Sequence, residues 1–157
     1  MVNFPIQTRL QTRTKVQTMP KETKSPRIPP PKTYLASPLY HAPMWRDWKT
    51  ANIGINIVST WHDSLTIEAN DKNPSAAVAG WRKNFVNLVR CKYLLAFAHT
   101  GDQPNGTLVE IGLGISKFKS IHLVGGFPWG SWKYSPYIHE HDSLHTALLA
   151  IKKDHYS

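Results

Sequence analysis

One carboxylate of this sequence has the surroundings of a catalytic or ligand-contacting group. Glu110 lies about one turn inside a helix that we expect to open at Thr107, after a polar loop at 99–106. The loop follows 93–98, a continuous apolar run that predicts a strand buried on both faces. Gly106 allows close approach of the backbone to a ligand, and the first helical amides attract oxygen-rich groups. Glu110 would then reach a substrate at the end of the strand.

The same residues also have a purely structural interpretation. Thr107 and Glu110 have the spacing of a capping box, in which each side chain accepts a hydrogen bond from a backbone amide of the helix start. Glu110 would then fold back onto its own helix and contact no substrate. The spacing alone leaves both interpretations open. A cavity beside Glu110 would distinguish them.

The elements that must position Glu110 alternate along the chain. We expect strands at 33–36, 53–58, 93–98 and 120–124, and helices at 41–52, from Pro74 to Val89, at 107–116 and at 141–154. The segments 62–74, 99–106 and 125–136 have the polar, glycine-rich or aromatic composition of loops. This order predicts an α/β, flavodoxin-like three-layer fold with a mainly parallel sheet of four to five strands.

Ligands of such folds bind outside the carboxyl ends of the strands. That rule selects Ser37 and Pro38, the segment 59–63, the loop 99–106 and the segment 125–132. His62 and Asp63 are site candidates there, with a solvated loop as the alternative. The glycine- and aromatic-rich run 125–130 predicts either a lid over a ligand or a surface that meets another subunit.

Metal, cofactor and thiol chemistry have weaker support. His139, His141 and Asp142 form one isolated cluster, and Ser143 or Asp142 as a helix cap explains it better, so we expect no metal. Cys91, at the end of an apolar helix, is expected to be buried and inert. We expect no cofactor, because no Ser/Thr-rich phosphate loop that would hold a flavin follows the first strand.

Much of the positive charge lies at the start of the chain. Residues 1–32 hold seven Lys or Arg and one acid, a net +6 of the total +9 over 157 residues. This Pro- and Thr-rich segment predicts a flexible basic arm before a domain at 33–157. The arm has four readings: a solvated tail, an anchor on nucleic acid, a contact with a neighbouring subunit or a transit peptide.

The sequence predicts a cytoplasmic protein that does not enter a membrane. Its apolar runs are under ten residues long, and its first 30 residues lack the apolar stretch of a secretory signal. A single cysteine, Cys91, allows no internal disulfide, which fits a reducing compartment.

Two short motifs resemble the nucleoside 2-deoxyribosyltransferase family, whose relatives include deoxynucleoside-monophosphate N-glycosidases. The segment 34–40 reads Tyr-Leu-Ala-Ser-Pro-Leu-Tyr, and 106–112 reads Gly-Thr-Leu-Val-Glu-Ile-Gly. The family pattern is a first strand like Tyr-Leu-Ala-Gly-Pro followed by a late Gly-Thr-x-x-Glu-hydrophobic-Gly. Both motifs are present in the right order. The resemblance extends over 33–154 in topology but over these motifs alone in identity.

This resemblance implies that Glu110 attacks the anomeric carbon of a 2′-deoxyribosyl group and releases the base, with Tyr34 orienting Glu110. A second base or water would resolve the glycosyl ester. Trp45, Trp61 or Trp129 would stack on the base. The family also implies a homo-oligomer. The implied substrate-binding residues are Ser37, Pro38, Trp61, Asp63, Asn84, Gly106, Thr107 and Trp129.

The sequence departs from the family pattern in three places, and two of them concern the acid that protonates the leaving base. Pro104 stands where transferases of the family carry an Asp, six residues before the nucleophile, and Asn84 or Asn87 replaces a second Asp. Ser37 replaces the glycine of the first motif. Asp102 or Asp63 is expected to supply the missing acid. The alternatives are a nucleotide-binding module without turnover and a structural or interaction protein that uses the basic arm.

Overall fold

Five parallel strands form one sheet in the computed structural model, which describes residues 28–51, 53–63, 74–128 and 130–157. The strand order is β2-β1-β3-β4-β5, which is the order of flavodoxin-like folds. All four neighbouring pairs are parallel, as the alternation of the sequence predicts. The strands are β1 (Lys32–Ala36), β2 (Asn56–Ile57), β3 (Tyr93–Ala98), β4 (Ser120–Gly125) and β5 (Ile138–His141).

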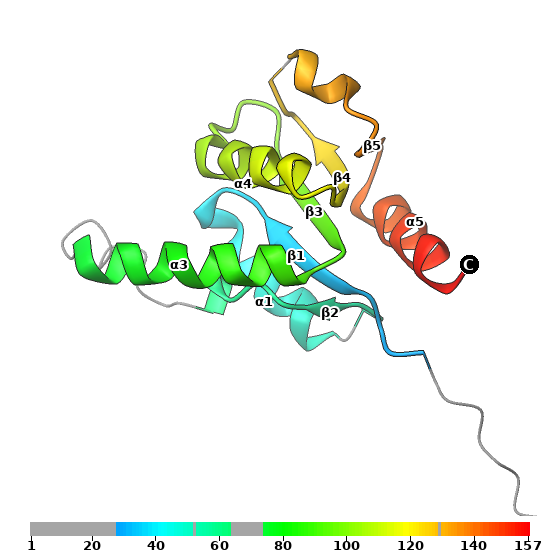
Figure 1. The fold of residues 1–157 in the computed structure, drawn as a ribbon, viewed down its shortest axis with the longest axis horizontal. Coiled ribbons are helices and arrows are strands. Elements are labelled where there is room, and N and C mark those ends of the chain that lie inside the picture. Colours follow the sequence, from blue (N-terminus) through cyan, green and yellow to red (C-terminus); the bar gives the residue numbers. More distant parts are fainter. Residues whose placement is uncertain (1–27, 52, 64–73, 129) are drawn as a thin grey trace, which may run out of the picture.

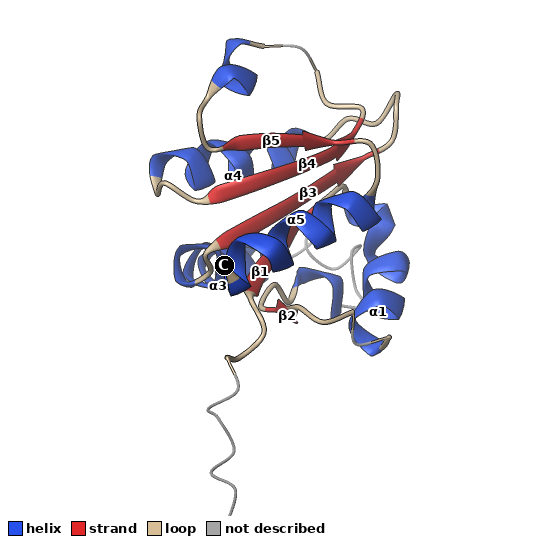
Figure 2. Ribbon diagram, turned by 90° about the vertical axis from the view of Figure 1, so that its right-hand side faces the viewer, coloured by secondary structure: helices blue, strands red, loops and turns tan. Residues whose placement is uncertain are grey.

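Helices cover both faces of the sheet and give the expected three layers (Figures 1 and 2). On one face lie α3 (Pro74–Arg90) and α4 (Asn105–Ser116), and on the other lie α1 (Ala42–Thr50) and α5 (Leu144–Tyr156). Short 3₁₀ turns follow or connect these elements at Leu39–His41, Trp61–Asp63 and Ser131–Tyr134. No helix among the described residues combines the length and apolar character needed to cross a membrane.

The central strand β3 explains why the sheet is buried on both sides. All six of its residues are buried. Leu94 and Ala96 pack with Ile111 of α4 on one face, whereas Leu95 packs with Ile151 of α5 on the other. A strand that contacts both helical layers must be apolar at every position, which is the continuous pattern that predicts it. Cys91, just before this strand, is buried as expected.

The last strand is the main feature that sequence reasoning missed. No element was predicted for 138–140, and 141 was expected to start the last helix, but residues 138–141 form β5 at the edge of the sheet. The run Ile-His-Glu-His is too polar to predict a strand, because an edge strand packs against only one neighbour. The final helix consequently begins at Leu144 rather than at 141. Its N-cap is Ser143, which was one of the two residues expected to cap it.

Several boundaries also differ from expectation. The strand predicted at 53–58 is reduced to two residues, and the helix predicted to open at Thr107 begins at Asn105 after the N-cap Pro104. The segments 1–27 and 64–73, together with Asn52 and Trp129, lie outside the described residues. The basic arm and its boundary with the domain therefore stay predictions.

A cluster of histidines connects β4 and β5 under α5. The His122 side chain is 3% exposed, and its Nδ1 lies 2.9 Å from Nε2 of His141. Its Nε2 lies 3.2 Å from Ser120 Oγ. Burial, followed by the nearby His141 and His139, lowers the pKa of His122 to about 3, and Asp154 of α5 opposes this shift. In the described part of the chain, no three potential ligands converge as a metal site would require.

We predict that His122 makes the protein sensitive to acid. His122 is neutral when folded but is protonated below a pKa of 6.5 when unfolded, so its burial destabilises the fold as pH falls below about 6.5. Between pH 7 and pH 5 this residue removes about 2 kcal/mol of unfolding free energy. Urea unfolding at both pH values should show that His122→Gln loses about 2 kcal/mol less than the wild type. Equal losses in the two proteins would contradict the assignment.

Candidate active site

A hydrogen bond between the first strand and the fourth helix places Glu110. The Tyr34 hydroxyl on β1 donates to Oε1 of Glu110 on α4 at 2.5 Å. Tyr34 is fully buried and Glu110 is 8% exposed. The two residues are 76 positions apart, so only the packing of α4 over the sheet brings them together. This pair is the one that the family resemblance implies.

The capping-box interpretation of Glu110 is wrong. The helix begins two residues before Thr107, so Thr107 lies inside α4 and no side chain caps its start. The Thr107 hydroxyl is buried and has no hydrogen-bond partner, and the Glu110 carboxylate bonds to Tyr34. Sequence spacing could not decide this point, because a capping box and a substrate-facing carboxylate need the same residues.

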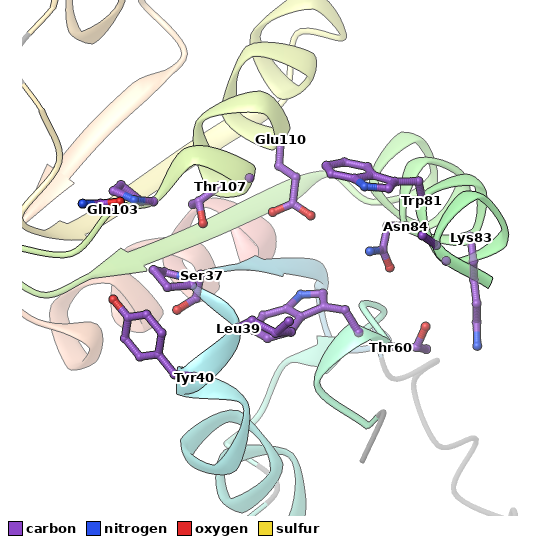
Figure 3. Close-up of a pocket in the computed structure, with 16 residues that line it drawn as sticks. Ser37, Leu39, Tyr40, Thr60, Trp81, Lys83, Asn84, Gln103, Thr107 and Glu110 are labelled. Atoms are coloured by element: carbon purple, nitrogen blue, oxygen red, sulfur yellow. The ribbon is translucent and has the colours of Figure 1, made fainter. Parts of the chain in front are cut away.

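Glu110 lies at the wall of a cavity of about 590 Å³ (Figure 3). This volume is in the range of small-molecule sites. Four segments surround it: the turn after β1 at 37–40, the start of the second 3₁₀ turn at 60–61, part of α3 between 77 and 84, and the stretch 103–110. The cavity is therefore at the carboxyl ends of β1 and β3, where the parallel sheet predicts a ligand.

Two buried hydroxyls in this cavity lack hydrogen-bond partners among the described residues. Ser37 Oγ and Thr107 Oγ1 are without a hydrogen-bond partner, and their side chains are 9% and 2% exposed. Both residues line the same cavity as Glu110, Ser37 from the turn after β1 and Thr107 from α4 (Figure 3). A buried hydroxyl without a partner costs about 1–3 kcal/mol, so a ligand that bonds to both would recover that energy. Such a ligand needs several oxygen atoms near the carboxylate, as a sugar has.

Aromatic side chains line the rest of the cavity. Trp61 is held in place because its indole Nε1 donates to the Leu35 carbonyl at 2.7 Å. Trp81 on α3 is half exposed, and Tyr40 lies on the turn after β1. Aromatic faces bind planar bases by stacking. The cavity can therefore accept a flat ring beside a sugar-sized polar region.

The acidity of Glu110 is shifted toward neutral pH. Burial raises the pKa of its carboxyl to about 7, and the hydrogen bond from Tyr34 opposes this rise. The pKa of Tyr34 is also raised, first by burial and then by the Glu110 charge, so the phenol keeps its proton. Near neutral pH the site thus contains both protonated and ionised forms of Glu110.

Asp102 has a different role from the acid that sequence reasoning expected. Its Oδ2 lies 2.9 Å from Nε2 of His41 and accepts from the His99 amide at 2.6 Å. Hydrogen bonds from His41 and Tyr40 lower the pKa of Asp102 to about 2. An ionised carboxylate is a poor proton donor, and Asp102 does not line the cavity. Its contacts fix the loop after β3 against the turn after β1.

Some expected binding residues lie in the cavity and others do not. Asp63 does not line it and forms an ion pair with Lys49 at 2.6 Å. Trp45 is fully buried on the opposite face of the sheet, so its expected stacking role is wrong. Trp129 lies outside the described residues. Phe127, from the expected lid, packs in the core.

The cavity-lining members of the expected set are Ser37, Pro38, Trp61, Asn84, Gly106 and Thr107.

Several cavity residues were not named as site residues by sequence reasoning. Trp81 lies on the apolar stripe of α3 and borders the cavity. Tyr40 directly follows the Ser-Pro turn, and that position could have indicated it. Thr60 and Gln103 belong to the segments 59–63 and 99–106 that the strand-end rule selects, although neither was named. Lys83 reaches the cavity through the packing of α3, which the local sequence does not indicate.

The fold was compared with known proteins. No family model and no curated protein matches the chain. A solved 2-deoxyribosyltransferase from the psychrotolerant bacterium Bacillus psychrosaccharolyticus is similar to it, with a TM-score of 0.57 and 14% identity over 74% of this chain and 89% of that one. The chain shares the fold of this protein. A CMP N-glycosidase from Clostridium botulinum matches at a TM-score of 0.46 and 15% identity, over 76% of this chain and 96% of that one.

The 2-deoxyribosyltransferase fold agrees with the resemblance found in the two sequence motifs. The first motif lies on β1 and the turn after it, and the second lies in the first turns of α4. In three dimensions both motifs border one cavity, and the Tyr34–Glu110 hydrogen bond joins them. Residues that are far apart in the sequence thus form one compact site in this fold.

We predict that Tyr34→Phe raises the pKa of Glu110 above its value of about 7, because a hydrogen bond that favours the ionised carboxylate is lost while its burial is kept. The measurement is a carboxyl-carbon NMR titration of Glu110. Tyr93→Phe is the matched control, because the Tyr93 hydroxyl bonds to Asp154 instead. An unchanged or lower pKa of Glu110 in Tyr34→Phe would show that the phenol does not stabilise the carboxylate.

Proposed function

We propose that this protein cleaves the N-glycosidic bond of 2′-deoxynucleosides or their monophosphates, with Glu110 as the nucleophile. The observation that carries the proposal is the buried Glu110 carboxylate, bonded to Tyr34, at the wall of a cavity with two unpartnered hydroxyls. The similar 2-deoxyribosyltransferase supports it at the level of the fold. A cytoplasmic location stays a prediction.

In the proposed reaction, an oxygen of ionised Glu110 forms a bond to the anomeric carbon of the sugar. The carbon–nitrogen bond breaks, and its electron pair leaves with the base. The transition state resembles an oxocarbenium ion, which a neighbouring carboxylate stabilises. Tyr34 holds the carboxylate so that one oxygen faces the sugar. Water or the nitrogen of a second base then attacks the same carbon and releases Glu110.

The cavity residues divide between the sugar and the base in this proposal. Ser37 and Thr107 bond to sugar or phosphate oxygens, since both hydroxyls lack partners within the described part of the chain. Gly106 contributes backbone to the same region, where an added side chain would meet no atom of the protein within 4 Å. Trp61 and Trp81 stack on the base. This assignment places the glycosidic bond between the polar and the aromatic parts of the cavity.

A nucleotide-binding module without turnover is the second candidate. Among the described residues, Glu110 is the one carboxylic acid that lines the cavity. If cleavage of the substrate requires an acid to protonate the base, this site would bind the substrate and leave it intact. Nucleic-acid binding through residues 1–32 stays a separate prediction, because that segment lies largely outside the described residues.

We predict that Glu110→Gln lowers base release by about a thousand-fold or more, because an amide cannot replace the nucleophile. Each deoxynucleoside and its monophosphate is incubated with the protein, with and without a second free base, and release is followed by chromatography. Glu140→Gln is the matched control, because Glu140 is an exposed residue of β5 outside the cavity.

The outcomes of this assay separate the candidates. Release that persists in Glu110→Gln would show that another group is the nucleophile. Binding without release by the wild type would favour the nucleotide-binding module. New nucleoside formed from the second base would identify a transferase, and free sugar would identify a hydrolase.

The expected homo-oligomer has a candidate surface on α3. Trp81, Phe85 and Val89 recur at helical spacing along this helix, but among its residues only Leu88 is buried. Val78, Trp81, Phe85 and Val89 lie three or four residues apart on one face and are 37–52% exposed. Two copies joined through α3 would bury roughly 1,000 Å², which is about the lower limit for a specific interface. We propose that a second copy of the chain covers this face.

We predict that Phe85→Glu weakens self-association by about a hundred-fold, because it introduces an unpaired charge into an apolar contact. Sedimentation velocity over a range of protein concentrations measures the effect. Leu149→Glu is the matched control, because Leu149 is 52% exposed on α5, which covers the other face of the sheet. A wild-type protein that stays monomeric at all concentrations would exclude the interface.

A further inference from the structure

The charge of the leaving base decides whether this site needs an acid. A neutral base that departs with the electron pair of the glycosidic bond becomes an anion unless a proton is supplied. General acids in active sites supply such protons. A base that is already a cation departs as a neutral molecule and needs no proton. The groups around Glu110 therefore carry information about the substrate.

The cavity wall offers amides where a proton donor would be needed. Within the described residues, Glu110 is the one carboxylic acid on the wall, and Asn84 and Gln103 are its amides. An amide can hydrogen-bond to a base but does not give up a proton at neutral pH. Glu110 itself must be ionised to act as the nucleophile. The acid therefore has to come from outside this set of residues or be unnecessary.

The two other carboxylates that sequence reasoning offered as the acid are both engaged elsewhere. Asp102 accepts from His41 and from the His99 amide and does not line the cavity. Asp63 is paired with Lys49. Releasing either carboxylate would break a charge-assisted hydrogen bond, so neither is available as a proton donor to the base.

The aromatic part of the cavity suits a cation. Trp61, Trp81 and Tyr40 line it, and aromatic faces attract cations through their electron density. The Tyr40 hydroxyl is hydrogen-bonded to the ionised Asp102 carboxylate, which adds negative charge behind that ring. Lys83, the one cation that lines the cavity in the described part of the chain, extends away from the Glu110 carboxylate (Figure 3).

We propose that this site takes N-glycosides whose base is positively charged before cleavage, such as nucleosides of N-alkylated purines. The inference rests on the proposed function and specifies its substrate class. Ionised Glu110 forms a bond to the anomeric carbon while the carbon–nitrogen bond breaks. The electron pair neutralises the cationic ring, and a neutral alkylated base leaves without proton transfer. Water then attacks the glycosyl ester, frees the sugar and restores the carboxylate, and its proton passes to the solvent.

The test compares 7-methyl-2′-deoxyadenosine with 2′-deoxyadenosine as substrates of the full chain, because the methylated adenine keeps its positive charge on both sides of pH 7. Both compounds also lose their bases spontaneously, and the spontaneous rate ratio is measured in the same buffer at pH 8. The ratio in question is the rate of base loss from the methylated compound divided by the rate from the unmethylated one. For an enzyme without an acid, this ratio should be at least as large as the spontaneous ratio. Its rate on the methylated compound should rise as pH passes about 7, where Glu110 ionises, and then stay level.

A different result would overturn the charge preference. An enzyme with a general acid accelerates base loss from the neutral compound more than from the methylated one. Its ratio of methylated to neutral rates would therefore be at least a hundred-fold below the spontaneous ratio. Glu68→Gln and Asp71→Asn would then identify the acid, because both residues belong to the segment 64–73 outside the described residues. If the preference for the methylated compound is lost but Glu110→Gln is inactive, the proposed function still holds and only the charge preference is refuted. No release of either base, or release that persists in Glu110→Gln, would refute the proposed function as well.

Discussion

The site depends on keeping one carboxylate in a buried position. Removing Glu110 from water raises its pKa to about 7, and the hydrogen bond from Tyr34 partly offsets that effect. The two residues belong to β1 and α4, which are far apart in the chain. Their contact requires β1 to pair with β3, and α4 to pack over both strands. The sheet order and the position of one helix are therefore direct conditions of the chemistry.

The fold was predictable where burial leaves a periodic or continuous pattern. The apolar run of β3 indicated a central strand, and the alternation of elements indicated a parallel sheet. The edge strand β5 was missed because its His-Glu-His run carries no such pattern. Glu110 was identified by a motif, while the choice between cap and catalytic residue needed the position of Tyr34. Local sequence does not encode that position.

Helix α3 shows a second limit of sequence reasoning. Its period identified the residues that share one face, but a period does not say what covers that face. Only Leu88 is buried, and the rest of the apolar stripe is exposed within one chain. Trp81 and Lys83 were missed as cavity residues for this reason. Because this helix also forms a wall of the cavity, the proposed self-association through α3 would act on the shape of the site.

The environments of two nearby carboxylates separate their chemistry. Glu110 is buried with a neutral phenol, and its pKa is about 7, whereas hydrogen bonds from His41 and Tyr40 lower that of Asp102 to about 2. Pairs of acids with divergent pKa values commonly divide the roles of proton donor and nucleophile. Here the more acidic group serves structure, because it joins the loop after β3 to the turn after β1. In the proposed reaction, Glu110 is then the one carboxylate that the described part of the cavity wall supplies, and the positive charge of the base stabilises the leaving group instead of an acid.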